Sequence, residues 1–135
     1  MKLACKYFGL AYLIGTIAGF ATYYIHEILM WISMFTVMPI IFGYFFFLYL
    51  KNTSCDSKTA FRETNILILF WIIASFVLDG FVYIVVIPTI FGNKSNWTFF
   101  IDQSPWIWLN YGTIIFLGHV SRLIYIKRFN AVQDK

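Results

Sequence analysis

The sequence predicts an all-α membrane protein in which residues 1–135 form one domain, a bundle of four transmembrane helices running up-down-up-down. Three observations predict this fold. Hydrophobic residues make up 61% of the chain and charged residues only 12%, whereas a soluble domain carries about 25% charged residues. Four stretches approach the roughly 20 apolar residues that a helix needs to cross a bilayer. The polar segments between these stretches are too short to form a further domain.

The four predicted spans are residues 7–24, 28–50, 65–90 and 106–126. Only a few residues around His26 and Glu27 separate the first two spans, so these are expected to form an antiparallel hairpin. A polar segment, KNTSCDSKTAFRE, joins the second span to the third. Ser104 and Pro105 mark the start of the fourth span as its N-cap and first helical residue.

The connection between the third and fourth spans, GNKSNWTFFIDQS, is expected to lie along the membrane surface. It and the start of the fourth span contain five aromatic residues placed as an interfacial belt would be: Trp97, Phe99, Phe100, Trp106 and Trp108.

The distribution of basic residues predicts that both termini are cytoplasmic. Nine of the ten lysines and arginines fall on one predicted side of the membrane, and positively charged loops are retained in the cytoplasm. These nine are Lys2, Lys6, Lys51, Lys58, Arg62, Arg122, Lys127, Arg128 and Lys135, and only Lys94 lies on the other side. The expected location is a multi-pass position in the bacterial inner membrane or another cellular membrane. Alternatively, MKLACK and the apolar run after it form a signal peptide cleaved near residues 19–21.

No metal site and no cofactor are expected. A structural zinc site needs about four cysteine or histidine ligands, and the candidates Cys5, Cys55, His26 and His119 are scattered over both predicted sides. Both cysteines fall on the cytoplasmic side, so their thiols are expected to be reduced.

Small residues predict where the first two helices pack, because membrane helices associate through close backbone approach. Ala11, Gly15 and Gly19 recur every four residues on one face of the first span, and they are expected to meet the neighbouring helix in preference to a second copy of the chain. In the second span, Pro39 removes a backbone hydrogen bond and is expected to bend the helix. Thr36, Pro39 and Gly43 share a face that forms either an accommodated kink lined by small residues or a hinge or cavity wall.

The third span contains the one acidic residue in the interior of a predicted span, Asp79. At 100° per residue, Asn65, Ser75, Asp79 and Tyr83 fall within an arc of about 80°. All markedly polar groups of this span therefore lie on one side. We expect Asp79 to face the other helices.

In the fourth span, Tyr111, His119 and Arg122 share an arc of about 100° with Ile115 and Gly118. At 1.5 Å per residue, Asp79 lies roughly 10 Å below the outer boundary and His119 roughly 10 Å above the inner one. The two side chains are therefore not expected to touch. The residues nearer in depth to Asp79 are Asn110, Tyr111 and Thr113 of this span and Thr16 and Gly19 of the first span.

Asp79 has two interpretations. A charge near the membrane centre costs about 3 kcal/mol or more on insertion scales, so such groups are usually paired, hydrated or functional. Asp79 is either a protonated group that clasps Ser75, Tyr83 or a neighbouring helix, or a proton or cation site. Near the inner boundary, Arg122 is expected to extend toward lipid phosphates and His119 to be a buried ring, or the two bind an anionic head group.

The sequence favours a protein without intrinsic catalysis, an accessory, assembly or protective component that acts through contacts in the membrane. Its expected partners are membrane lipids and another membrane protein or itself as a homo-oligomer. Nucleic acid is not an expected partner, because no basic helix of soluble character is present. The alternative is a small oligomeric transporter or channel in which Asp79 binds a proton or cation.

A third hypothesis is a membrane enzyme that modifies lipid head groups. Its reactive residues would be His119 and Arg122 on the inner side, or His26, Glu27 and Asp102 on the outer side. Either set requires its members to meet around one cleft.

Overall fold

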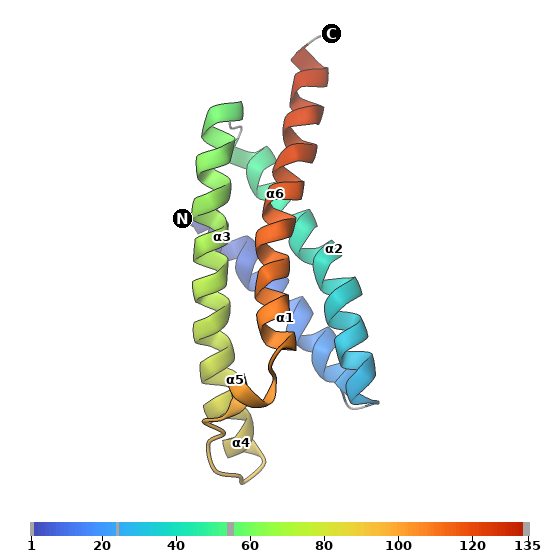
Figure 1. The fold of residues 1–135 in the computed structure, drawn as a ribbon. Helices are drawn as coiled ribbons and strands as arrows, with labels where there is room; N and C mark the ends of the chain where they lie inside the picture. Colours follow the sequence, from blue (N-terminus) through green and yellow to red (C-terminus); the bar gives the residue numbers. More distant parts are fainter. Residues whose placement is uncertain (1, 24, 54–55, 134–135) are drawn as a thin grey trace.

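The computed structural model describes residues 2–23, 25–53 and 56–133, and every regular element in this part is helical (Figure 1). The long elements are α1 (Lys2–Tyr23), α2 (Glu27–Thr53), α3 (Ser57–Asp79) and α6 (Trp106–Gln133). A π-helix, η1 (Gly80–Val86), and the short α4 (Ile87–Ile90) continue α3, and α5 (Phe99–Asp102) precedes α6. Cys55 and Lys135 lie outside the described residues, as do the side chains of Glu27 and Lys58.

Two helical stretches, Ile28–Thr53 and Thr59–Ile90, are long and apolar enough to cross a membrane. They correspond to the second and third predicted spans. The stretch at residues 106–126 is also helical, but it contains Asn110, His119 and Arg122, which reduce its apolar character. Length and composition single out no further helix among residues 2–23, 25–53 and 56–133.

Few residues in the most apolar part of these two helices are buried, and many of their large apolar side chains are exposed. Only 17% of the most apolar window of Ile28–Thr53 and 22% of that of Thr59–Ile90 are buried. Large side chains such as Ile40, Leu69 and Ile73 are exposed. Core helices of a soluble protein would instead direct such side chains inward.

The long helices meet around an aromatic core. α2 packs along both α1 and α6, and α6 also packs along α3. Trp71 of α3 is fully buried, and its ring centroid lies 4.3 Å from that of Phe46 on α2. Phe8 of α1 reaches the same tryptophan, with 5.7 Å between ring centroids. In Figure 1, the turn between α1 and α2 lies well apart from α4 and α5 at the lower end of the molecule.

Glycines allow the closest approaches between helices. A Cβ added at Gly15 would lie 2.2 Å from the end of the Met38 side chain on α2, and one at Gly19 would lie 3.8 Å from the Met34 sulfur. The small-residue face of α1, which includes the fully buried Ala11, thus meets the neighbouring helix, as its pattern predicts.

Around Pro39, α2 is helical from Glu27 to Thr53 without interruption. Gly43, one turn further on, accepts a hydrogen bond through its carbonyl oxygen from the Ser121 hydroxyl of α6, at 3.0 Å. This face of α2 is therefore part of its contact with α6. The hinge at Pro39 stays a prediction.

The start of α3 follows local capping rules, whereas the start of α6 differs from the prediction. Asp56 caps α3, because its carboxylate accepts the Thr59 backbone N–H at 3.1 Å, a preferred N-cap arrangement. α6 begins at Trp106, one residue later than the Ser104–Pro105 signal predicts. Pro105 still contributes, since its carbonyl oxygen accepts the Leu109 N–H at 3.1 Å.

The π-helix lies between Asp79 and Pro88. A proline inside a helix has no N–H for the carbonyl four residues earlier, and its ring crowds that carbonyl. For Pro88 this carbonyl belongs to Ile84, which instead accepts the backbone N–H of Asn96 at 3.0 Å. Widened π turns are rare and often occur at functional sites. The connection after α4 is thus hydrogen-bonded to the Ile84 carbonyl, for which Pro88 has no N–H.

Candidate functional site

Asp79 joins three helices. Its side chain, on the last residue of α3, is 7% exposed. The Tyr12 hydroxyl of α1 donates a hydrogen bond to Oδ1, and the Tyr111 hydroxyl of α6 donates one to Oδ2, each at 2.7 Å. Both carboxyl oxygens are therefore oriented by a phenol from a different helix.

A cavity of about 270 Å³ borders Asp79. Its walls come from α1, α2, the continuous α3–η1–α4 helix, the segment around α5 and the start of α6. The polar groups that line it, besides Asp79, are Tyr12, Thr16, Ser75, Tyr83, Gln103 and Asn110. The larger apolar ones are Met30, Trp31, Met34, Met38, Phe42, Ile87, Phe99 and Ile107. An acid thus lies at the wall of a space with both a polar and an apolar part.

The connection before α6 contributes Phe99 and Gln103 to the wall of this cavity. Phe99 is buried and stacks on Tyr83 of the π-helix, with ring centroids 5.0 Å apart and planes 1° apart. Phe100 stacks on Phe76 at 4.7 Å. Phe99 and Phe100 therefore pack against rings of η1 and α3, and their place in an interfacial belt stays a prediction. Trp97, by contrast, is 77% exposed.

Of the predicted site residues, the structure brings four together. Ser75 is buried and lines the Asp79 cavity, Tyr83 lines the same cavity, and Tyr111 contacts the carboxyl directly. Asn65, predicted on the same face of α3, is exposed. The buried face of this helix runs through Thr64, Trp71 and Ser75, and Asn65 lies about 100° from Thr64.

His119 and Arg122 form a separate cluster. Both contact Phe61 of α3: the His119 ring stacks on it with centroids 6.5 Å apart, and the Arg122 guanidinium lies 4.7 Å from its centroid. Arg122 Nε is buried without a hydrogen-bond partner. On α6, Gly118 lies against Ile68, whereas Ile115 is exposed, so the predicted arc of α6 is only partly turned inward.

The outer residues named as reactive candidates are used in local turns. His26 accepts the Ile28 backbone N–H through Nδ1 at 3.2 Å, and Asp102 accepts a hydrogen bond from the Thr98 hydroxyl at 2.7 Å. The α1–α2 turn and α5 are also well separated in Figure 1. Within the described part of the chain, no three His, Cys, Asp or Glu side chains come close enough to hold a metal ion.

Two features of the site were missed from the sequence. Tyr12 lies within about 20° of Gly19 on the helical wheel of α1, so a hydroxyl on the small-residue face was a usable signal. Met30, Met34 and Met38 recur every four residues on α2 and together line the cavity. This stripe is also visible in the sequence, but apolar residues in an apolar helix do not stand out.

The fold and the site together define a helical protein with two helices apolar enough to cross a membrane and an acidic cavity among its helices. Neither a family model, nor a curated protein, nor a solved structure matches the chain.

Proposed function

We propose that this chain is a multi-pass membrane protein, a four-helix bundle with four spans and both termini in the cytoplasm, that binds a proton or another cation at Asp79 and moves it across the membrane. The observation that carries the proposal is that Asp79 borders a cavity. A polar clasp would need only the two tyrosines and no adjoining space.

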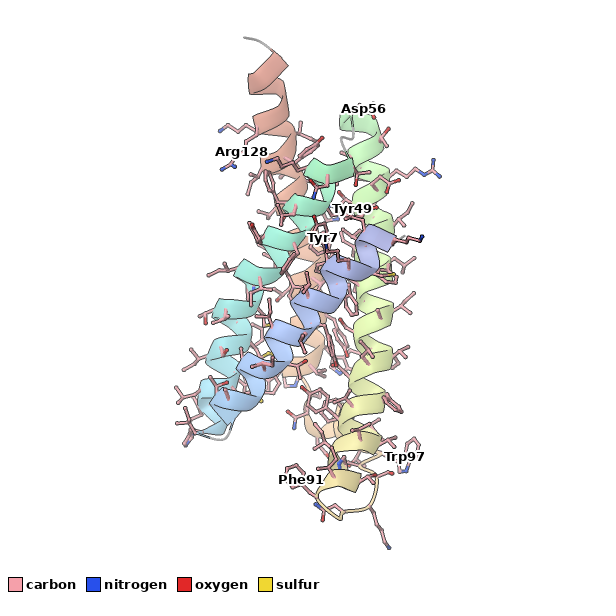
Figure 2. All side chains as sticks on the ribbon, turned by 180° about the vertical axis from the view of Figure 1, so that it is seen from behind. Tyr7, Tyr49, Asp56, Phe91, Trp97 and Arg128 are labelled. Atoms are coloured by element: carbon pink, nitrogen blue, oxygen red, sulfur yellow. The ribbon has the colours of Figure 1, made fainter. Side chains whose placement is uncertain are left out.

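The outward-facing apolar side chains support the membrane location. A soluble monomer rarely exposes contiguous apolar patches larger than a few hundred Å², yet both Ile28–Thr53 and Thr59–Ile90 expose many large apolar side chains. For the orientation, basic and aromatic ends are separated: Arg128 lies at the same end as Asp56, and Trp97 lies at the opposite end with Phe91 (Figure 2).

The surroundings of Asp79 support cation binding. Intramembrane acids are costly, and they commonly mark ion or proton pathways. Among the described residues lining the cavity, none is a lysine, arginine or histidine, so Asp79 has no basic partner there. A proton or a cation entering the cavity would supply the missing positive charge.

The test is solute flux through the purified protein in liposomes. We expect proton or monovalent-cation flux above that of empty liposomes, and we expect Asp79→Asn to abolish it while the protein stays folded in the membrane. The matched control is Asp56→Asn, which removes a carboxylate at the far end of α3. Asparagine is also a good N-cap, so this variant should keep wild-type flux.

Equal flux in Asp79→Asn and wild type would contradict a role for Asp79. No flux in either protein would contradict transport and favour the accessory role, in which the chain acts through contacts with another membrane component. The enzyme hypothesis has less support, because His119 and Arg122 gather at Phe61 and not at the cavity.

A further inference from the structure

The walls of the Asp79 cavity restrict the class of cation that could bind there. A proton needs no space of its own, whereas about 270 Å³ approaches the lower end of the range of small-molecule sites, about 300 to 1,000 Å³. The cavity therefore has room for an organic ligand.

The ligand must be positive at one end and apolar at the other. Asp79 provides the only formal charge among the described residues of the lining. The same lining includes the side chains of Met34 and Met38 and the stacked rings of Tyr83 and Phe99. Aromatic faces attract organic cations, and methionine side chains adapt to varied apolar shapes.

Trp31 is shared by the walls of this cavity and of a second pocket. It lines the Asp79 cavity, and it also lines an apolar pocket of about 520 Å³ with Ile28, Ile32, Phe35, Thr36 and Trp106. Its ring centroid lies 6.0 Å from that of Trp106 on α6. Ile28 and Ile32 are exposed, so in a bilayer this pocket opens toward lipid.

We infer that the Asp79 cavity takes a small organic cation with an apolar body, and that this ligand passes between the lipid and the cavity at Trp31. The inference rests on the proposed function, because it names the substrate class of the same site. The apolar body of the ligand favours entry from the lipid, and its positive charge favours binding at Asp79.

Binding to the full chain in lipid nanodiscs tests the ligand class. The probe is benzyltrimethylammonium, and its control is neopentylbenzene, which has the same shape with carbon in place of the charged nitrogen. We expect wild type to bind the cation at least about tenfold more tightly than the neutral molecule, and Asp79→Asn to lose this preference. Asp56→Asn should keep it.

Equal binding of both probes to wild type would overturn the ligand class, and this comparison needs no variant to fold. Cation preference retained in a folded Asp79→Asn protein would also overturn it. If Asp79-dependent proton flux occurs without organic-cation binding, only this inference fails. If the cation binds at Asp79 but no flux occurs, only the transport proposal fails.

Stopped-flow binding tests the route. Trp31→Ala should raise both the association and dissociation rates of benzyltrimethylammonium severalfold, because the barrier between the two pockets is removed. Trp97→Ala, at an exposed tryptophan outside both pockets, is the control and should leave both rates unchanged. Unaltered rates in Trp31→Ala would overturn entry at this residue.

Discussion

Two phenols determine how the Asp79 carboxyl lies at the cavity wall. Tyr12 and Tyr111 approach different oxygens of the same group at equal distances of 2.7 Å. Because they come from α1 and α6, the carboxyl holds the same orientation only while both helices stay packed against α3. The hydrogen bonds thus link the geometry of the site to the packing of the helices.

Removing either phenol hydroxyl should destabilise the protein. Tyr12→Phe and Tyr111→Phe each keep the ring but leave one carboxyl oxygen without its donor, and we expect each to lower the free energy of unfolding by about 1 to 3 kcal/mol. Tyr44→Phe, at an exposed ring, is the control and should change it little. Thermal unfolding in detergent measures the difference, and equal midpoints for all three variants would contradict the role of the two hydrogen bonds.

The inward position of Asp79 followed from the sequence because polar residues on one helix share a face. The sequence predicted the hydrogen-bond partners of Asp79 only in part. Tyr111 was one of several residues expected near Asp79 in depth, whereas Tyr12 lies on a helix whose small residues drew attention to packing. A hydrogen bond between side chains 67 positions apart depends on how the helices cross, which helical periodicity alone does not determine.

At the scale of elements, the helix extents were predictable and their irregularities were not. Long apolar runs predict the existence of α2 and α3 directly. Within the π-helix, the Ile84 carbonyl accepts the backbone N–H of Asn96, which lies in the connection beyond α4. That contact is tertiary, so the local sequence around Pro88 predicts a disturbance but not its form. The inward turn of Phe99 likewise required knowledge of Tyr83 opposite it.

Gly118 allows α6 to approach α3, and filling it should separate them. A Cβ there would lie 2.6 Å from Ile68 and 3.3 Å from Phe46, both buried. Overpacking of this kind typically costs about 1 to 3 kcal/mol, so Gly118→Ala should lower the thermal unfolding midpoint. Gly112→Ala on the same helix meets nothing within 4 Å and should leave the midpoint unchanged or raise it slightly. A Gly118→Ala protein as stable as wild type would show that this contact tolerates the extra methyl group.

At the scale of the whole molecule, the proposed orientation depends on which residues lie at each end. The end that contains Arg128 and Asp56 is opposite the end that contains Trp97 and Phe91 (Figure 2). Two helices are apolar enough to cross a membrane, and the proposal adds α1 and α6 as further spans. If only α2 and α3 crossed, the start of α1 and the connection after α4 would lie on the same side. If all four long helices crossed, the start of α1 and this connection would lie on opposite sides.

Thiol labelling distinguishes these two topologies. Cys5 is exposed near the start of α1, and Cys55→Ser leaves it as the only cysteine, since the chain has two. Replacing both cysteines with serine and introducing Lys94→Cys places the only thiol in the connection after α4. We expect a membrane-impermeant maleimide to label the second protein in intact cells and the first only after lysis, because four spans put Cys5 in the cytoplasm. Labelling of both from outside would contradict four spans and support two, and it would leave α1, with Tyr12 at the Asp79 cavity, on the outer side of the membrane.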